Sequence, residues 1–191
     1  MQKYRFLILT LLSIPAIAQA DIFTDLSKRW HAQDQSAPVA ATIEVGFSPG
    51  TTAEALVLKA IKSAHSSIRV LAYSFTSKPI AQALVDAHNH GVDVQVIVDK
   101  SQKSEKYTSA TFLANMGIPV RIDSMHAIQH NKLLEIDQKH IETGSFNFTS
   151  AAAHKNAENA LVIWNDPPLA QVYLAYWQEH WRHSEDYLPR Y

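Results

Sequence analysis

The sequence predicts a single α/β domain in which a mostly parallel, mixed β-sheet carries helices on both faces. Segments typical of strands and helices alternate through the first half of the chain, as in sheets built with right-handed crossovers. Hydrophobic residues make up 47% of the 191 residues, enough for one substantial core, and the absence of Cys excludes disulfide support. The 17 Lys and Arg nearly balance the 18 Asp and Glu, so an anionic partner would need a local binding site.

Residues 1–20 are expected to form a secretory signal peptide. Two cations within the first five residues precede an apolar run, 6–17, and Ala18 and Ala20 are the small residues that a signal peptidase reads. The apolar run is shorter than the roughly 20 residues that a membrane-spanning helix needs. We therefore expect export, cleavage after Ala20, and one folded domain over residues 21–191.

Strands and helices are expected to follow one another in turn between residues 42 and 122. The strands are short β-rich runs, and the helices carry apolar residues at helical spacing. Thr51, three residues before Glu54, predicts a capping box, and Ser77 is expected to cap the second helix. The expected strands are 42–48, 67–74, 92–99 and 119–122, and the expected helices follow Thr51, follow Ser77 and surround Phe112.

After residue 125 the pattern changes to a hairpin, a strand and a final helix. The expected hairpin strands are 131–136 and 140–143, and the third strand is 159–164. Asp166 and Pro167 then open an amphipathic helix. One face of this helix should form core or a subunit interface, and it carries Leu169, Val172, Tyr173, Tyr176, Trp177 and Trp181.

The residues that carry chemistry lie between positions 130 and 159. They are His130, Lys132, Asp137, Gly144, Ser145, Asn147, Glu158 and Asn159. Their types and offsets resemble the HKD signature of the phospholipase D superfamily, and segments 47–50, 72–77 and 91–99 are also similar to its small bacterial nucleases. The resemblance covers nearly all of the chain beyond the signal peptide and implies a phospholipase D-like fold.

The resemblance implies a phosphodiesterase that uses no metal and no cofactor. His130 and Lys132 project from one side if the strand is regular, and an imidazole can attack phosphorus to form a phosphohistidine. Lys132, Ser145 and Asn147 would donate to the phosphoryl oxygens. Gly144 would let the backbone approach the phosphate closely.

Two acidic residues of the pattern are expected to play different parts. Asp137 has odd parity relative to His130, so it should point away from the phosphate and tie down the turn after the strand. Glu158 is expected, on the resemblance, to accept a hydrogen bond from a histidine ring and fix its tautomer. Asn159 belongs to the same motif segment.

The mechanism implied by the resemblance needs two histidines, one to attack and one to protonate the leaving oxygen. Larger members carry two HKD motifs in one chain, whereas this chain has one. We therefore expect a homodimer in which two copies of His130 face each other across a two-fold axis.

The resemblance is closest to small, EDTA-resistant, periplasmic endonucleases, so DNA is the expected substrate, with RNA left open. We expect a periplasmic protein without stable membrane association. The alternatives are a phospholipase D that acts on membrane lipids and an inactive nucleic-acid-binding protein. The cluster Lys100, Lys103 and Lys106, and Lys155 beside the motif, could track a phosphate backbone or be solvated. Tyr73 and Phe75 could line the cleft, but we expect them to pack in the core.

No catalytic metal is expected, because His126 and His130 lie in a loop rather than on one helix and no H-E-x-x-H sequence occurs. The remaining histidines are expected to be surface or capping residues. They are His31, His65, His88, His90, His140, His154, His180 and His183.

Overall fold

The computed structural model describes residues 40–104 and 108–189, and the elements of this part form one eight-stranded sheet with helices packed on it. The signal peptide expected at residues 1–20 lies outside the described residues. The strands are β1 (Thr42–Ser48), β2 (Ser67–Ala72), β3 (Asp93–Asp99), β4 (Val120–Asp123), β5 (Lys132–Ile136), β6 (His140–Gly144), β7 (Glu158–Trp164) and β8 (Glu185–Asp186). The helices are α2 (Thr52–Lys62), α3 (Lys78–Asn89), α4 (Ser109–Asn115), α5 (Ser150–His154) and α6 (Pro167–His183), with a short 3-10 turn, η1 (Lys100–Lys103).

The sheet is mixed, as expected, but its parallel part is smaller than the sequence suggested. The strand order is β1-β7-β6-β5-β2-β3-β4-β8. Only β2, β3 and β4 are parallel to their neighbours in that group, and the other pairs are antiparallel. The difference arises because a tight turn joins β5 to β6, β7 returns antiparallel to β6 after α5, and β5 and β1 pair antiparallel with β2 and β7.

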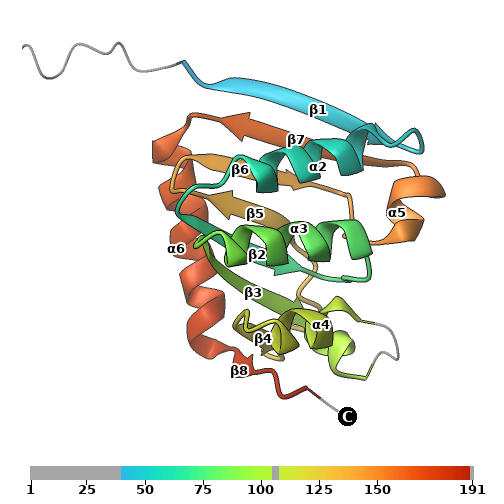
Figure 1. Cartoon of the computed structure of the whole chain (residues 1–191), viewed down its shortest axis with the longest axis vertical. Helices are drawn as coiled ribbons and strands as arrows, with labels where there is room; N and C mark the ends of the chain where they lie inside the picture. The colour runs from blue at the N-terminus through green and yellow to red at the C-terminus, as the bar shows by residue number, and fades with distance from the viewer. Residues whose placement is uncertain (1–39, 105–107, 190–191) are drawn as a thin grey trace, which may run out of the picture. The chain divides into compact units, whose positions relative to one another are not determined.

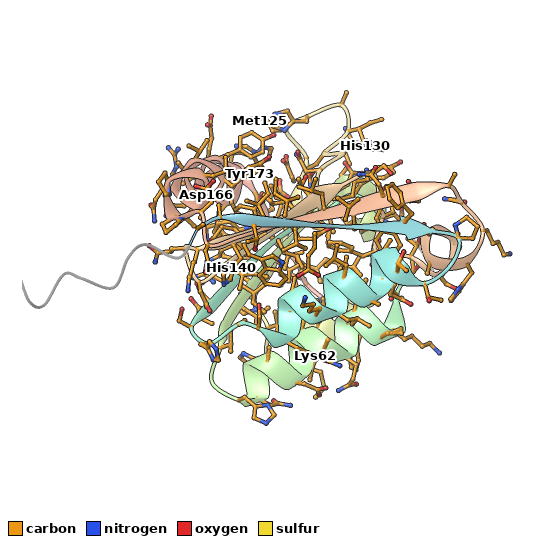
Figure 2. All side chains as sticks on the ribbon, turned by 90° about the horizontal axis from the view of Figure 1, so that it is seen from above. Lys62, Met125, His130, His140, Asp166 and Tyr173 are labelled. Carbon is orange, nitrogen blue, oxygen red and sulfur yellow. The ribbon has the colours of Figure 1, made fainter. Side chains whose placement is uncertain are left out.

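Helices cover both faces of the sheet, which confirms the predicted layering. The helices α2 and α3 run side by side over one face, and α6 crosses the other (Figure 1). The end-on view separates the layers: Lys62 of α2 lies on one side, and Tyr173 of α6, Met125 and His130 lie on the other (Figure 2). The larger core lies under α2, α3 and α4, and the smaller one under α6.

The N-termini of α2 and α3 test two predictions about helix capping. Ser77 caps α3 by accepting the N–H of Ile80, as expected. The capping box at Thr51 is wrong, because Thr51 has a left-handed backbone (φ 69°) and makes no side-chain cap. The hydroxyl of Thr52 instead exchanges hydrogen bonds with the backbone of Phe47 (2.8 and 2.7 Å) and fixes the turn between β1 and α2.

The aromatic stripe of α6 divides between core and surface. Trp177 is buried and donates its indole N–H to the backbone oxygen of Val70 (3.0 Å), and Trp181 stacks on it. Val172 and Tyr176 remain 65% and 43% exposed. Within the described ranges, neither α6 nor any other helix has the length and apolar content to cross a bilayer.

Candidate active site

The loop that carries His130 is fixed on both sides of the histidine. Gln129 donates its backbone N–H to Asp99 Oδ2 at the end of β3 (2.8 Å), and its side-chain oxygen accepts the N–H of Asn131 (2.7 Å). The backbone oxygen of Asn131 accepts the N–H of Tyr73, directly after β2 (3.1 Å). His130 itself is exposed. The ends of β2 and β3 therefore hold the backbone around an imidazole that solvent can reach.

Tyr73 connects His130 with Lys132, the first residue of β5. The Tyr73 and His130 ring centroids are 4.6 Å apart, and Lys132 Nζ lies 5.2 Å from the tyrosine centroid. Lys132 Nζ also donates to the backbone oxygen of His130 (2.6 Å). Strand β5 begins at Lys132, one residue after the expected start at Asn131. The Tyr73 ring contacts both the His130 ring and the Lys132 ammonium group. Tyr73, which we expected in the core, is half-buried at the site, whereas Phe75 is a core residue.

Lys132 and Glu158 belong to one site, although β6 separates their strands. Burial lowers the pKa of Lys132, and the negative charge of Glu158 acts in the opposite direction. A lysine with reduced access to water and a carboxylate nearby provides a strong, fixed positive charge for an anion that enters the site.

Gly144 at the end of β6 permits a close approach of two backbones. A Cβ atom at this position would lie 2.3 Å from the backbone oxygen of Asn159. Ser145 and Phe146 both donate their N–H groups to that same oxygen (3.1 Å each). We expected the glycine to bring the backbone near a phosphate; its close neighbour in the structure is β7, and the approach sets Ser145 beside Glu158.

Glu158 is oriented by two neutral side chains. Ser145 Oγ donates to Glu158 Oε2 (2.6 Å) and accepts the N–H of Asn159 (3.1 Å), while Asn156 Nδ2 donates to Glu158 Oε1 (2.9 Å). We expected Glu158 to accept a hydrogen bond from a histidine; among the described residues its donors are Ser145 and Asn156 instead. The hydroxyl of Ser145, expected to contact the phosphate, is engaged in holding Glu158.

Asn147 offers an amide that the described residues leave incompletely used. Its Oδ1 is buried without a hydrogen-bond partner in this part of the chain. The flanking Phe146 and Phe148 are both buried in the larger core and fix the backbone of the segment. A buried polar group of this kind is stabilised when a ligand or water completes its hydrogen bonds.

Asp137 lies at the other end of β5 from His130. Its carboxylate accepts the N–H groups of His65, Ser66 and Ser67 and the hydroxyl of Ser66 (each 2.8 Å). Burial alone would raise the pKa of Asp137, but these hydrogen bonds outweigh it and lower the pKa. The carboxylate therefore ties the β5–β6 turn to the start of β2, which is the arrangement that a structural role requires.

Two residues that support the site, Asp99 and Gln129, were missed by sequence reasoning, and Tyr73 was weighed as a residue of the cleft but expected in the core. Asp99 is the last residue of β3, and Gln129 lies in the loop before β5; both are buried. For Asp99 the available signal was a polar residue at the carboxyl end of a parallel strand, because such ends meet at one edge of a sheet.

The basic residues of the η1 region have individual contacts. Lys100 Nζ donates to the backbone oxygen of His126 (2.9 Å), and Lys103 pairs with Glu185 at the surface (3.4 Å). Lys106 lies outside the described residues. Lys155, which follows α5, is exposed beside Asn156 and the Glu158 segment.

One expectation about the histidines is wrong. His180, expected at the surface or in a cap, is 4% exposed, and its ring contacts the buried carboxylate of Asp123. His126 and His183 lie beside the same carboxylate. The histidines could not be grouped from the sequence because Asp123 and His180 are 57 positions apart and meet only through the fold.

Comparison with known proteins identifies the family of this chain. Residues 57–181 match the family described as "Cardiolipin synthase, PLD-like domain", and the match includes the segments that carry His130, Lys132, Ser145, Asn147 and Glu158. The chain belongs to the phospholipase D superfamily. The superfamily predicted from the HKD signature is therefore confirmed, and with it the general class of enzyme.

Relatives in the phospholipase D superfamily carry names of lipid-cleaving enzymes. A "Phospholipase D" of Rickettsia bellii is 40% identical over 131 residues, which are 69% of this chain and 65% of the relative. The "Mitochondrial cardiolipin hydrolase" of Mus musculus is 30% identical over 125 residues, 65% of this chain and 56% of the relative. The chain thus spans less than two thirds of the length of these two curated relatives.

A solved structure of the superfamily matches over a larger share of its length. The crystal structure of Nuc from Salmonella typhimurium, a phospholipase D family member, has a TM-score of 0.76 to this chain and 47% sequence identity. The match covers 78% of this chain and 99% of Nuc. The predicted α/β, phospholipase D-like fold is confirmed.

Proposed function

We propose that the protein is a metal-independent phosphodiesterase that cleaves nucleic acid, with DNA as its main substrate, through a covalent intermediate at His130. The observation that carries the proposal is the meeting of His130, Lys132 and Glu158 from separate elements at one edge of the sheet. An exposed nucleophile beside a buried cation and an oriented carboxylate suits a reaction in which negative charge develops on phosphoryl oxygens.

The first step breaks one phosphorus–oxygen bond. An imidazole nitrogen of His130 attacks phosphorus and forms the N–P bond, while the P–O bond to the leaving oxygen breaks. Lys132 and the amide of Asn147 stabilise the charge on the non-bridging oxygens. Glu158, held by Ser145, keeps Lys132 charged and in place. The leaving oxygen needs a proton, and a second imidazole is the group suited to supply it near neutral pH.

The second imidazole is proposed to be His130 of the partner subunit in a homodimer. After protonating the leaving oxygen, the partner's His130 takes a proton from water, and the resulting hydroxide attacks phosphorus. The P–O bond to water then forms, the N–P bond breaks, and both histidines return to their initial states. Water is consumed, and the products are a phosphomonoester and an alcohol.

Exposed apolar residues near the site support the proposed dimer. Phe47, Met125 and Ile128 are 62%, 66% and 55% exposed. Phe47 pairs in register with Asn159, next to Glu158, while Met125 and Ile128 precede His130 in its loop. A second copy placed over this side would bury apolar area and bring the two histidines together.

Nucleic acid is favoured as the substrate by the similarity to Nuc and by exposure. The match to Nuc has 47% identity and covers 99% of that protein, whereas the match to the Rickettsia bellii phospholipase D has 40% identity and covers 65% of it. His130 is exposed rather than enclosed, and Lys155 is exposed beside the Glu158 segment, so an extended polyanion could reach both. We further propose that the protein acts in the periplasm after export.

The test is cleavage of supercoiled plasmid by purified protein in excess EDTA, with His130→Ala as the inactive variant and His90→Ala as the matched control. His90 is exposed at the end of α3 and takes no part in the site. We expect nicking by wild type and His90→Ala, loss of at least about 10⁴-fold in His130→Ala, and a covalent protein–DNA adduct in rapidly quenched wild type. Activity that disappears in EDTA while His130→Ala remains active would overturn the proposal.

A phospholipase D activity is the second candidate, because the 40% identical relative bears that name. Phosphatidylcholine vesicles, offered under the same conditions, distinguish the two. Release of choline without plasmid cleavage would assign the lipid reaction to the same site. Binding of DNA without cleavage of either substrate would indicate a nucleic-acid-binding protein that has lost turnover.

A further inference from the structure

Three histidines and one aspartate meet at the far end of α6, among β4, β8 and the loop that precedes β5. Asp123 is the last residue of β4 and is fully buried, His126 lies three residues later, and His180 and His183 occupy the last turn of α6. The end of α6 comes down beside β4 and β8 (Figure 1). One ligand atom from each of the four residues lies within 4.8 Å of the other three.

The three histidine rings converge on a single carboxylate oxygen of Asp123. Asp123 Oδ2 lies 2.7 Å from His180 Nδ1, 3.2 Å from His126 Nδ1 and 3.3 Å from His183 Nε2. The other carboxylate oxygen is taken by the backbone N–H of Met125 (2.9 Å), which fixes the orientation of the group. The ring centroids of the three histidines are 5.0 to 5.5 Å apart.

Hydrogen bonding alone leaves this cluster incompletely satisfied. His126 and His180 each form a hydrogen bond with Asp123 Oδ2, whereas His183 Nε2, which is shielded from solvent, has an ion-pair contact with that oxygen at 3.3 Å but no well-aligned hydrogen bond among the described residues. A buried ring nitrogen without a well-aligned partner is costly. A cation among the four groups would use the lone pairs of all three rings and the charge of the carboxylate at once.

We propose that Asp123, His126, His180 and His183 bind one Zn²⁺ ion per chain, separate from the catalytic residues. Three imidazole nitrogens and one carboxylate oxygen form a donor set that Zn²⁺ prefers. In a tetrahedral site with bonds of about 2.0–2.1 Å, ligand atoms lie about 3.3 Å apart, so the widest pair here has to close by about 1.5 Å. His126 has the freedom to make that movement, because its side chain is 46% exposed.

The proposed ion is structural rather than catalytic. Four protein ligands fill a tetrahedral site and leave no position for substrate or water. The ion would tie the end of α6 to the loop whose last residues hold His130. That link continues through Tyr176, whose ring packs against His180 (4.5 Å) and whose hydroxyl accepts a hydrogen bond from Asn131 (3.2 Å).

The first test is direct metal binding by full-length protein prepared without a polyhistidine tag. After removal of metals by chelator and dialysis, ZnCl₂ is titrated by calorimetry and the bound metal is counted by mass spectrometry. We expect one Zn²⁺ per chain, and a tetrahedral visible spectrum when Co²⁺ replaces it. Absence of stoichiometric binding by the folded wild-type protein would overturn the proposal.

The second test compares His126→Gln and His183→Gln with His90→Gln, a matched loss of a histidine outside the cluster. We expect each cluster variant to weaken Zn²⁺ binding by more than about 100-fold, beyond the 10- to 100-fold typical of an outer partner, and His90→Gln to leave it unchanged. Equal affinity in all three variants would show that the ion binds elsewhere. If His183→Gln does not fold, His126→Gln decides, because its ring is half exposed.

Hydrogen exchange separates a structural role from mere binding. We expect residues 124–131 to exchange faster in the metal-free protein than in the Zn²⁺-bound protein, and His126→Gln to abolish the difference. Unchanged exchange on addition of Zn²⁺ would overturn the link to the catalytic loop. The nuclease proposal is tested by loss of turnover in His130→Ala and the zinc proposal by metal content, so either can fail alone.

Discussion

The two ends of β5 carry parts of one sequence motif but have opposite physical characters. At the start of the strand, His130 is exposed and Lys132 has a lowered pKa because it is buried. At the other end, Asp137 accepts four hydrogen bonds from residues 65–67. The first end keeps polar groups available for a ligand, whereas the second has already used its hydrogen-bonding capacity within the fold.

This contrast explains how residues of one motif can serve two purposes. A strand of five residues separates its ends by roughly 17 Å at 3.4 Å per residue, so Asp137 cannot touch a phosphate bound at His130. The motif therefore includes residues at both ends of β5: His130 and Lys132 at its start, and the structural Asp137 at its end. Substitutions at the start of β5 should therefore change turnover, and substitutions at its end should change stability.

Among the substitutions that test this contrast, Glu158→Gln has the largest expected effect on turnover, although the loss stays below that expected for His130→Ala. Glutamine keeps the shape of the side chain and can still accept the hydrogen bond from Ser145. It removes the negative charge, which raises the pKa of Lys132 against the effect of burial. We expect kcat for plasmid cleavage to fall about 10²- to 10³-fold, with the free energy of unfolding within about 0.5 kcal/mol of wild type. Initial rates and urea denaturation measure the two quantities. A fall in stability without a fall in kcat would contradict the contrast between the ends of β5.

The fold could be predicted where each element carries its own pattern. The alternating apolar residues of β3 and the capped start of α3 at Ser77 are local signals, and both elements lie where expected. The proportion of parallel strands was overestimated, because it depends on which strands pair rather than on what each strand contains. The start of α2 differed because Thr52, not Thr51, bonds to the preceding strand.

The site could be predicted where residues lie close in the sequence. Ser145 and Glu158 were both singled out, yet their mutual hydrogen bond was not expected, because it depends on the close approach at Gly144. Tyr73 was weighed as a residue of the cleft but expected in the core, because aromatic residues beside apolar strands usually pack there; its place against His130 depends on the pairing of β2 with β5. Contacts across the sheet are the part that a single sequence leaves open.

The second-largest expected effect is a pH dependence of the free energy of unfolding, and it comes from Glu135, which lies within β5. Glu135 is fully buried on the α6 side, and burial raises its pKa from its usual 4.5 to about 7, although Arg69 acts in the opposite direction. Because the folded-state pKa is above the unfolded value, this group favours folding below about pH 4.5, and that advantage is lost as pH rises through 7. The loss amounts to about 3 kcal/mol.

Urea denaturation of wild type and Glu135→Gln at pH 5, 6, 7 and 8 measures the loss of stability that Glu135 causes as pH rises. Glutamine mimics the protonated carboxyl, so we expect the variant to lose less stability than wild type as pH rises. Glu142→Gln tests the same effect on the opposite face of the sheet: burial raises the pKa of Glu142 well above its usual range, so that variant should also lose less stability than wild type as pH rises. Parallel curves for wild type and Glu135→Gln would show that burial does not raise the pKa of Glu135 above its unfolded value.

The smallest expected effect is the loss of stability in Asp137→Asn, and it bears most directly on the comparison. Asparagine keeps one acceptor oxygen but loses the charge, which should cost about 1–2 kcal/mol after allowance for partial exposure, while kcat per folded molecule stays unchanged. Because the pKa of Asp137 is lowered in the folded state, its contribution is present above pH 4 and disappears as pH falls, so the two proteins should converge in acid. If kcat instead falls as far as in Glu158→Gln, the ends of β5 are coupled, and the aspartate positions the catalytic residues through the strand.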